Sequence, residues 1–299
     1  GIDILLTKTP GSLASAMFRS KYITDPVKQT WCKLRKSSLY ASHGGRKEAF
    51  YRGKKRLVYQ YDAKSMYPSI IEQMEILPLR KDWDLTADLD TWLNAKGGIG
   101  TIYFKYPKKC NKAGFIPLLP VLCDDRLMFP LEGRSECTSF EARQAIQQGC
   151  HVYLMKGFYY NSGVTWLAEF QNDMINKRES ANGGAMATIY KLLSVAVVGK
   201  LMQRVEDYNI NDLFAFAKEN NLPVNVLKRV INLPLRKELK TGTLFYPEWF
   251  SLILGMARAN IAKASIKVNA LQIATDAAIT EEYHGAEFDI DGIRYILEA

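Results

Sequence analysis

Two long helical stretches, joined by a glycine-rich turn and set between segments that favour strands, limit most strongly what this chain can fold into. The first helix is predicted over residues 164–178 and the second over residues 185–206, with Ser-Ala-Asn-Gly-Gly at residues 180–184 as the turn. Helices that follow one another through so short a turn lie antiparallel. We therefore predict a mixed α/β (α+β) fold in which a helical hairpin projects from a platform of sheet.

Short sequence patterns predict the elements around this hairpin. Thr138 and Glu141 stand three positions apart, as in a capping box, and indicate a helix that ends at Gly149. Pro247 is typical of the first turn of a helix, and the apolar pattern after it extends to about Val268. Runs rich in strand-forming residues predict strands at residues 57–61, 100–105, 151–160 and 271–280.

The composition excludes several classes of protein. Of the 299 residues 47% are hydrophobic and 24% are charged, which is typical of a globular protein with a sizeable core. No apolar run is long enough to cross a membrane, and the first residues lack a signal-peptide pattern. The five cysteines include no C-x-x-C pair, which indicates reduced thiols and no zinc cluster. We expect an intracellular protein without membrane contact.

Basic residues are concentrated in one short part of the chain. Lysine and arginine number 40 against 31 acidic residues, and between Lys28 and Arg56 ten basic residues accompany one acid, Glu48. Such a run is either a solvated face or a track for a nucleic-acid backbone, and both interpretations stay open here. A glycine pair beside a cation would let a phosphate approach the main chain. The candidate nucleic-acid contacts are Gly44, Gly45, Arg46, Lys54, Lys55 and Arg56.

Two aspartates stand alone at the ends of predicted strands. Asp62 follows the strand at residues 57–61, and Asp276 lies between two short strand-forming runs, the pattern of a hairpin with a carboxylate at its tip. Carboxylates on adjacent strand ends can hold two Mg²⁺ ions roughly 3.5–4 Å apart, as in phosphoryl transfer. By spacing alone, an aspartate that only caps a turn is the commoner explanation for each.

Three motifs give these residues a context. Residues 62–69, Asp-Ala-Lys-Ser-Met-Tyr-Pro-Ser, resemble the first catalytic motif of family B DNA polymerases, D-x-x-S-L-Y-P-S. Residues 191–200 resemble the second, K-x-x-x-N-S-x-Y-G-K, at their ends only, and residues 274–276 resemble the third, D-T-D, with alanine first. Looser matches, the first of them to a Y-x-G-G element, keep the family's order at residues 42–45, 127–133 and 246–249. The chain resembles the palm and fingers of a protein-primed polymerase of the phage or linear-plasmid type.

The resemblance implies two-metal nucleotidyl transfer. Asp62 and Asp276 would be the catalytic, metal-binding carboxylates, and the carbonyl of Ala63 would add a ligand. Two Mg²⁺ (or Mn²⁺) ions would activate a primer 3′-hydroxyl for attack on the α-phosphate of a dNTP. The implied partners are primer-template DNA, dNTPs, and a priming protein or other subunits that supply missing domains. The implied compartment is the cytoplasm of a host cell or an organelle.

The same resemblance implies a nucleotide-binding set. Tyr67 would lie beneath the incoming sugar, where its ring leaves no room for a 2′-hydroxyl, and Ser65 belongs to the same motif. Lys191 would face the triphosphate, where a cation offsets the charge that develops on pyrophosphate. Lys177 and Arg178, earlier on the facing helix, are either a second phosphate contact or ordinary exposed charges.

The resemblance also divides the chain. Residues 1–56 would form the basic N-terminal region, residues 57–163 and 207–299 the palm, and residues 164–206 the fingers. A proofreading exonuclease would precede residue 1, and residues 292–298 would be the strand where a palm ends and a thumb begins. Both of those domains are therefore expected to be absent.

Departures from the motifs leave three functions open. Val195, Ala196 and Val198 replace the polar and aromatic groups of the second motif, and Ala274 removes a carboxylate near the metals. The retained aspartates favour an active or partly active DNA polymerase. The apolar second motif favours a degenerate polymerase that persists as a nucleic-acid-binding or structural component of a larger assembly. An unrelated nucleic-acid-binding module is disfavoured, because six matches occur in the family's order.

Overall fold

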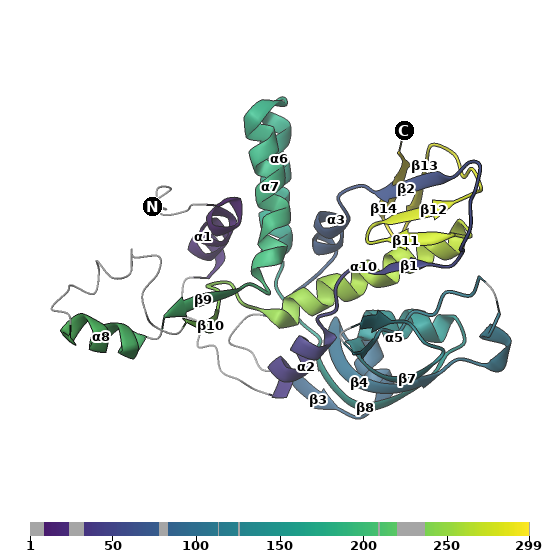
Figure 1. Cartoon of the computed structure of the whole chain (residues 1–299), viewed down its shortest axis with the longest axis horizontal. Helices are drawn as coiled ribbons and strands as arrows, with labels where there is room; N and C mark the ends of the chain where they lie inside the picture. Colours follow the sequence, from purple (N-terminus) through teal and green to yellow (C-terminus); the bar gives the residue numbers. More distant parts are fainter. Residues whose placement is uncertain are drawn as a thin grey trace.

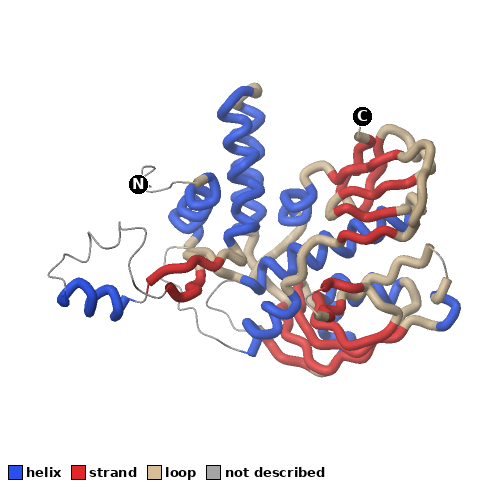
Figure 2. The backbone as a smooth tube through the Cα atoms, viewed as in Figure 1, coloured by secondary structure: helices blue, strands red, loops and turns tan. Residues whose placement is uncertain are grey.

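Two antiparallel sheets on either side of one long helix form the body of the protein. The computed structural model describes residues 9–23, 33–77, 83–112, 114–124, 126–208, 210–219 and 237–298. Helix α10 (Pro247–Lys267) lies between the sheets, and a helical hairpin projects away from them (Figure 1). Figure 2 shows the two large sheets apart from each other, with helices between and beside them and the small hairpin of β9 (Arg204–Tyr208) and β10 (Lys237–Thr241) on the opposite side of α10 from the larger sheet. The mixed α/β fold with a projecting hairpin is confirmed.

The larger sheet carries both aspartates. It has six strands in the order β1-β11-β12-β2-β14-β13. Strand β2 pairs with β12 on one side and with β14 on the other, so Asp62 lies opposite Ala277 and opposite Ile296. Because β1 pairs with β11, part of the basic N-terminal region belongs to this sheet. The strands are β1 (Lys47–Ala49), β2 (Tyr59–Ala63), β11 (Gln272–Ala274), β12 (Ala277–Thr280), β13 (Glu287–Ile290) and β14 (Ile293–Leu297).

The second sheet has four strands and one buried face. Its order is β3-β8-β4-β7, formed by β3 (Asp84–Thr86), β8 (His151–Tyr160), β4 (Gly97–Lys105) and β7 (Glu132–Thr138). Side chains alternate between the two faces of a strand, so Ile102 and Phe104 are buried while Tyr103 and Lys105 are exposed. Two hairpins complete the strands: β5 (Val121–Cys123) with β6 (Arg126–Met128), and β9 (Arg204–Tyr208) with β10 (Lys237–Thr241).

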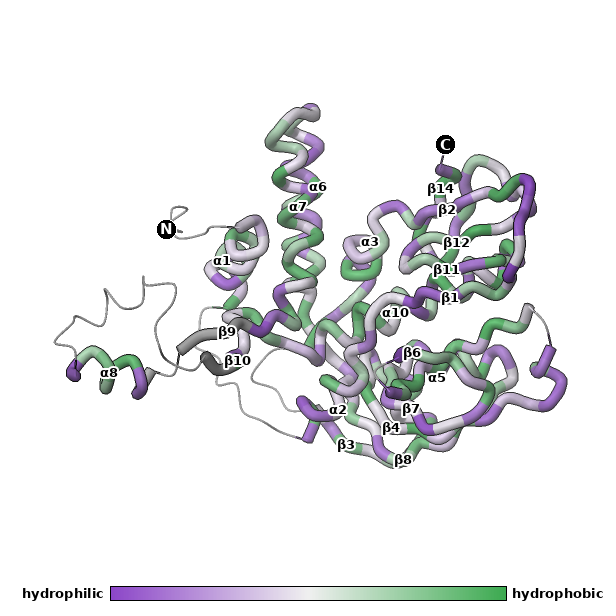
Figure 3. The backbone as a smooth tube through the Cα atoms, in the orientation of Figure 1, coloured by the Kyte–Doolittle hydropathy of each residue, from purple (hydrophilic) through white to green (hydrophobic). Residues whose placement is uncertain are grey.

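The projecting hairpin consists of α6 (Trp166–Ser180) and α7 (Gly184–Lys200). Its turn needs unusual backbone, because Asn182, Gly183 and Gly184 all have positive φ. Hydrophobic and hydrophilic stretches alternate along the hairpin (Figure 3). The other helices are α1 (Pro10–Tyr22), α2 (Lys33–Ala41), α3 (Met66–Glu72), α4 (Leu89–Asn94), α5 (Ser139–Gln147), α8 (Ile210–Glu219) and the 3₁₀ turn η2 (Lys108–Cys110). Every helix in the described part of the chain is too short or too polar to span a bilayer.

Two cores hold these layers together. The larger lies where α10, α3 and the base of the α6–α7 hairpin meet the six-stranded sheet, and it includes Trp249, Leu252 and Ile253 of α10. The smaller fills the inner face of the four-stranded sheet around Trp92 and Phe104. Helix α10 packs against strands of both sheets. Because buried apolar area stabilises a fold by about 25 cal/mol per Å², the stability of both sheets depends on α10.

The structure confirms several predicted elements and corrects two. The capping box of Thr138 and Glu141, the helix from Pro247 and the strand hairpin at residues 271–280 are present. The first strand lies two residues later than predicted, as β2. The helix predicted over residues 185–206 ends at Lys200, because residues 204–208 pair with residues 237–241 as β9 and β10. The boundaries of the predicted domains remain a prediction.

A buried ion pair joins α5 to α10. The Arg258 Nε lies 2.8 Å from Glu141 Oε1, and both side chains are only 1% exposed. The Arg258 Nη1 also donates to the carbonyl of His43 (2.6 Å), on the loop before β1. Burial raises the pKa of Glu141, but the charge and hydrogen bonds of Arg258 outweigh it and hold that pKa below its ordinary value. Gly255 lets α10 approach Thr138 closely, since an added Cβ there would collide with the threonine side chain.

Loss of one partner of this pair is expected to be costly. Glu141→Gln leaves the Arg258 guanidinium buried without a counter-charge, so the free energy of unfolding should fall by about 3 kcal/mol. Glu132→Gln, at the exposed pair with Lys105, is the matched control and should change it by less than about 1 kcal/mol. Urea unfolding followed by circular dichroism measures both. Equal effects of the two substitutions would contradict this interpretation.

Candidate active site

A two-residue turn brings the second aspartate beside the first. Thr275 and Asp276 connect β11 to β12, and Thr275 takes the left-handed conformation with a φ of 65°. The backbone N–H of Ala63 donates to the carbonyl of Asp276 (3.0 Å). The two aspartates, 214 positions apart in sequence, thus lie at neighbouring strand ends, as the sequence predicted.

Gly45 and Arg46, just before β1, pack against this turn. The backbone N–H of Thr275 donates to the carbonyl of Arg46 (2.8 Å). A Cβ added to Gly45 would lie 2.6 Å from the Cγ2 of Thr275, so a larger residue would displace the turn. Gly44, by contrast, is exposed, and an added Cβ would meet nothing within 4 Å. Gly45 is therefore needed for packing, and Gly44 is the glycine that a ligand can approach.

A cleft of about 470 Å³ separates the aspartates from the helical hairpin. Its floor is the strand end and turn at residues 62–68 together with Asp276. Its far wall comes from both helices of the hairpin: Met174, Ile175 and Arg178 of α6, and Tyr190, Lys191, Ser194 and Val195 of α7. The cleft thus has both aspartates on its floor, with Lys64 beside them, and Arg178 and Lys191 on the far wall.

The two aspartates have no ion-pair partner among the described residues, although Lys64 lines the same floor. Burial, and then the charges of Asp276 and Glu298, raise the pKa of Asp62 from 3.8 to about 6. Neither aspartate forms an ion pair with any described residue, and no described cluster of three metal-ligating side chains exists there. Two carboxylates without a counter-ion, with only oxygen donors nearby, suit a hard cation such as Mg²⁺. The residues present therefore fit the implied metal.

The turn after β2 presents the nucleotide-binding candidates. Ser65 precedes α3 in the left-handed conformation (φ 54°), and its side chain makes no capping hydrogen bond. Tyr67 is half-buried in the cleft wall. Burial, and then the charge of Asp276, raise the pKa of Tyr67 above its ordinary value, so the phenol stays neutral. Both side chains line the cleft beside Asp62 and Asp276.

Lys177 and Arg178, the two cations predicted on α6, point in different directions. Arg178 is exposed and lines the cleft across from Lys191, which α7 contributes. Lys177 instead forms an i,i+4 ion pair with Asp173 (3.0 Å) and does not line the cleft. Successive residues on a helix point about 100° apart, so one of the two had to turn away. The structure therefore corrects Lys177 and retains Arg178 as a candidate phosphate contact.

Arg46 is a second correction. Its side chain is buried, where it forms an ion pair with Glu48 and donates to the carbonyl of Pro117 (2.6 Å). The guanidinium also stacks on the ring of Phe129 at 3.9 Å. A side chain held in these contacts supports the loop and is not available to a phosphate.

The other candidate cations of the N-terminal region, at residues 54–56, lie at or near the surface. Lys54 and Arg56 are exposed. Lys55 pairs with Glu281 (2.5 Å) and lies over the ring of Tyr51, which fastens this segment to the hairpin of β12. These positions keep the prediction of a backbone contact open for Lys54, Lys55 and Arg56.

The structure adds four residues that the sequence alone did not single out. Lys64 and Tyr190 line the cleft; Lys64 lies at a variable position inside the first motif, and Tyr190 directly precedes the second. Ser194 donates to the side chain of Gln171 and accepts from it at its carbonyl, which locks α7 to α6. Glu298 acts on Asp62 through its charge. The position of Lys64 and Tyr190 in or beside a motif could have indicated them. Only strand pairing brings Glu298 near Asp62.

Asp62→Asn should make the protein more stable at high pH only. The pKa of Asp62 is higher in the folded state, so its ionised form costs stability. The cost is fully present above about pH 6 and disappears only below the unfolded pKa of 3.8, where both states are protonated. Allowing for solvent screening, the gain at pH 8 should be about 1 kcal/mol. Urea midpoints at pH 8 and at about pH 3, below both pKa values, test this, with Asp90→Asn as an exposed control. A gain that is the same at both pH values would refute the assignment.

Comparison with known proteins agrees with this geometry. The family described as DNA polymerase type B, organellar and viral, matches residues 1–284. No curated protein matches closely enough to count as a relative. The structure of Phi29 DNA polymerase in an orthorhombic crystal form is similar, with a TM-score of 0.62, 14% identity, and coverage of 92% of this chain and 49% of that one.

Two complexes of the same polymerase are also similar. The ternary complex with primer-template DNA and incoming nucleotide substrates has a TM-score of 0.61 and 16% identity over 92% of this chain and 49% of that one. The post-translocation binary complex with primer-template DNA has values of 0.62 and 15% over 92% and 48%. This chain thus spans about half the length of Phi29 DNA polymerase. It belongs to the organellar and viral family of type B DNA polymerases.

Proposed function

We propose that this chain carries the nucleotidyl-transfer site of a DNA-directed DNA polymerase. The observation that carries the proposal is the meeting of Asp62 and Asp276 at the floor of a cleft whose walls hold Tyr67, Arg178 and Lys191. Acidic groups for metals, a flat ring, and cations for phosphates are the parts that such a transfer needs.

Asp62 and Asp276 would hold the divalent cations, with the carbonyl of Ala63 as a further ligand. Mg²⁺ or Mn²⁺ bound there would polarise the phosphate and lower the pKa of the attacking hydroxyl. Type B polymerases in general use divalent metals, and the uncompensated charge on the two aspartates supports such a site here. The raised pKa of Asp62 means that proton and cation compete for this carboxylate as the pH falls toward 6.

The remaining side chains would bind and orient the nucleotide. Arg178 and Lys191, on the wall across from the aspartates, would receive the triphosphate and offset the charge of the departing pyrophosphate. Tyr67 would lie under the sugar, where a half-buried ring leaves little room for a 2′-hydroxyl. Ser65 is near enough in the same turn to contact the nucleotide.

A degenerate polymerase is the second candidate, because one wall of the cleft is apolar. Val195 lines the cleft and is 47% exposed, where the family has a polar residue. Val198, in place of an aromatic residue, is buried in the core of the hairpin and reaches no ligand. Such a chain would still bind DNA, through the exposed Gly44 and the basic segment at residues 54–56.

The partners follow from the same proposal. The solved complexes of Phi29 DNA polymerase contain primer-template DNA and nucleotides, and the shared fold supports the same partners here. A priming protein, subunits that supply further domains, and action in a host cytoplasm or an organelle remain predictions of the family resemblance.

Primer extension tests the proposed activity. With Mg²⁺ or Mn²⁺, a primer-template and dNTPs, the protein should extend the primer, and Asp62→Ala and Asp276→Ala should each lower the rate at least about 10³-fold by loss of metal binding. Asp84→Ala, an exposed aspartate on β3, is the matched control and should retain full activity.

The two candidates give different results in this assay. Extension that both site variants abolish supports a working polymerase. No extension with either metal, together with salt-sensitive DNA binding that both site variants retain, supports the degenerate polymerase and rejects catalysis. Loss of extension in Asp84→Ala as well would show that the effect is not specific to the site.

Sugar selection gives a finer test of the role of Tyr67. Tyr67→Val removes the ring but keeps a branched apolar side chain, so ribonucleotide incorporation relative to deoxyribonucleotide should rise by about tenfold or more, which is about 1.4 kcal/mol of discrimination. Single-nucleotide insertion kinetics with dCTP and CTP measure this ratio. Tyr51→Val, at an exposed tyrosine away from the cleft, serves as the control. An unchanged ratio in Tyr67→Val would exclude a steric role for the ring.

A further inference from the structure

The outer face of the four-stranded sheet carries two exposed tyrosines side by side. Tyr103 of β4 lies directly opposite Tyr153 of β8, and they are 48% and 69% exposed. Their strand neighbours Ile102, Phe104 and Leu154 are buried on the other face. Two large aromatic rings side by side leave a joint apolar area in water, which a ligand or partner would cover.

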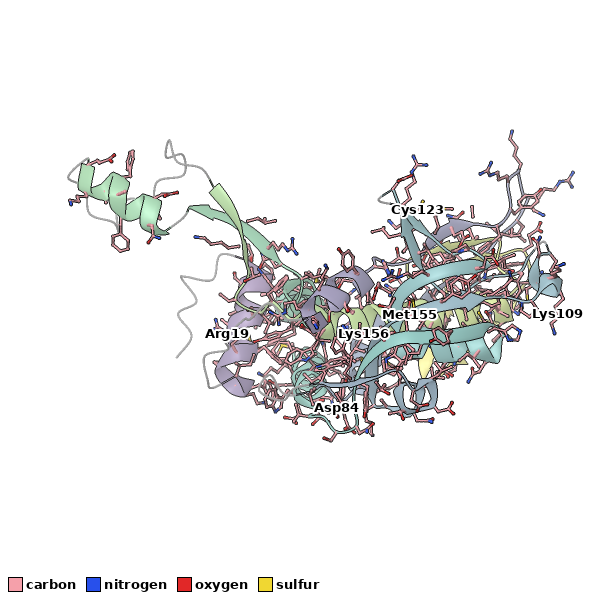
Figure 4. All side chains as sticks on the ribbon, turned by 90° about the horizontal axis from the view of Figure 1, so that it is seen from below. Arg19, Asp84, Lys109, Cys123, Met155 and Lys156 are labelled. Atoms are coloured by element: carbon pink, nitrogen blue, oxygen red, sulfur yellow. The ribbon has the colours of Figure 1, made fainter. Side chains whose placement is uncertain are left out.

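Cations surround this pair of rings. Arg134 of β7 lies opposite Tyr103, and Lys156 of β8 lies opposite Thr101, two residues before Tyr103 on β4. Figure 4 views the protein from the side on which this sheet lies and labels Met155 and Lys156 on it. Lys156 also lies over the ring of Phe158 at 4.3 Å. The face therefore combines flat rings with positive charge.

Helix α2 extends the face into a groove. Lys33, Lys36 and Tyr40 are exposed at spacings of three and four residues, which places them on one side of the helix. A groove of about 680 Å³ lies between that side of α2 and the sheet, with Arg134 and Lys156 also lining it. Arg134, which lines the groove, lies opposite Tyr103 on the sheet, so the groove adjoins the pair of tyrosines. Together they form one track, which we call the sheet track.

The sheet track has an excess of positive charge. Glu136 is the one acid among the described residues that line the groove, against four cations. Its carboxylate already accepts from the hydroxyl of Thr101 (2.7 Å) and lies 3.5 Å from Arg134. A polyanion would therefore meet little repulsion along the groove.

The sheet track is separate from the catalytic cleft. Among the described residues that line the cleft and the groove, none is shared. The smaller core, α5 and α10 lie behind the sheet, between it and the larger sheet that holds the aspartates (Figure 1). A ligand on the sheet track would be a second one and not part of the substrate in the cleft.

We propose that the sheet track binds single-stranded nucleic acid. Bases would stack on Tyr103 and Tyr153, and the backbone would run past Arg134 and Lys156 toward Lys36. Exposed aromatics on a sheet with cations beside them suit unpaired bases, whose faces are free, whereas a duplex offers no free faces to stack. This function is independent of whether the cleft catalyses nucleotide transfer.

Binding of a fluorescent dT₁₂ oligonucleotide in EDTA tests the proposal, because EDTA removes any metal-dependent contribution from the cleft. Tyr103→Ala and Tyr153→Ala should each weaken binding about fivefold or more. Tyr283→Ala, at a tyrosine that is equally exposed on another part of the surface, should have no effect. Tyr153→Leu keeps an apolar side chain on the strand and should weaken binding as alanine does. A duplex competitor should displace the oligonucleotide poorly.

Charge substitutions and cross-linking locate the ligand. Arg134→Gln and Lys36→Gln should each lower the slope of log affinity against log salt by about 0.7, the value for one phosphate of a single strand. Lys112→Gln, at an exposed lysine off the track, should leave it unchanged. An oligonucleotide with 5-iododeoxyuridine should cross-link to peptides that contain Tyr103 or Tyr153, and U₁₂ in place of dT₁₂ distinguishes RNA from DNA as the preferred strand.

Three results would overturn the proposal. The first is unchanged affinity in both tyrosine variants while the fold is intact by circular dichroism. The second is cross-links confined to peptides that line the catalytic cleft. The third is a protein that self-associates through this face, seen as a mass that rises with concentration and falls back in Tyr153→Ala, with no cross-link to the track.

Discussion

The buried pair of Glu141 and Arg258 is the interaction on which the rest of the structure depends. It joins the helix behind the four-stranded sheet to α10, and the same guanidinium holds the carbonyl of His43. From His43 the chain runs through Gly45 to Arg46, whose carbonyl holds the turn of Thr275 and Asp276. Three contacts thus link this ion pair to the turn that carries Asp276: Glu141 with Arg258, Arg258 with the carbonyl of His43, and the carbonyl of Arg46 with Thr275.

Buried charge is costly unless it is paired and hydrogen-bonded, and the protein treats its charges in two different ways. Glu141 and Arg46 are buried with counter-charges and neighbouring donors or acceptors. Asp62 and Asp276 lie near each other without an ion-pair partner among the described residues, and burial, followed by the charge of Asp276, raises the pKa of Asp62. The pair of aspartates without an ion-pair partner supports the cation site proposed above.

The hairpin of α6 and α7 shows how a motif can lose polar groups and keep its shape. Gln171 and Ser194 join the two helices by reciprocal hydrogen bonds between buried groups. Val198 packs in the core, where an apolar residue adds to stability. Tyr190 and Lys191 place an aromatic and a basic side chain on the cleft wall, about one turn from Val195, which lines the same cleft. The architecture of the wall therefore survives although its chemistry has changed.

The sequence by itself determined the local features: the capping box of Thr138 and Glu141, the helix from Pro247, the turn between α6 and α7, and the hairpin that carries Asp276. Each depends on residues a few positions apart, through capping, turn conformation and alternation, so a single segment contains the information. The family motifs also identified Asp62, Tyr67 and Lys191 as the residues to follow into the cleft.

Only the tertiary structure decided which charged and aromatic side chains are free to act. Arg46 and Arg178 each stand beside a lysine in sequence, yet one is buried against Phe129 and the other lines the cleft. The pairing of β9 with β10 keeps residues 204–206 out of helix α7, which the sequence predicted to include them. The pairing of β4 with β8 places Tyr103 on the outer face of the sheet. Burial and strand pairing arise from contacts between distant parts of the chain, and no local pattern records them.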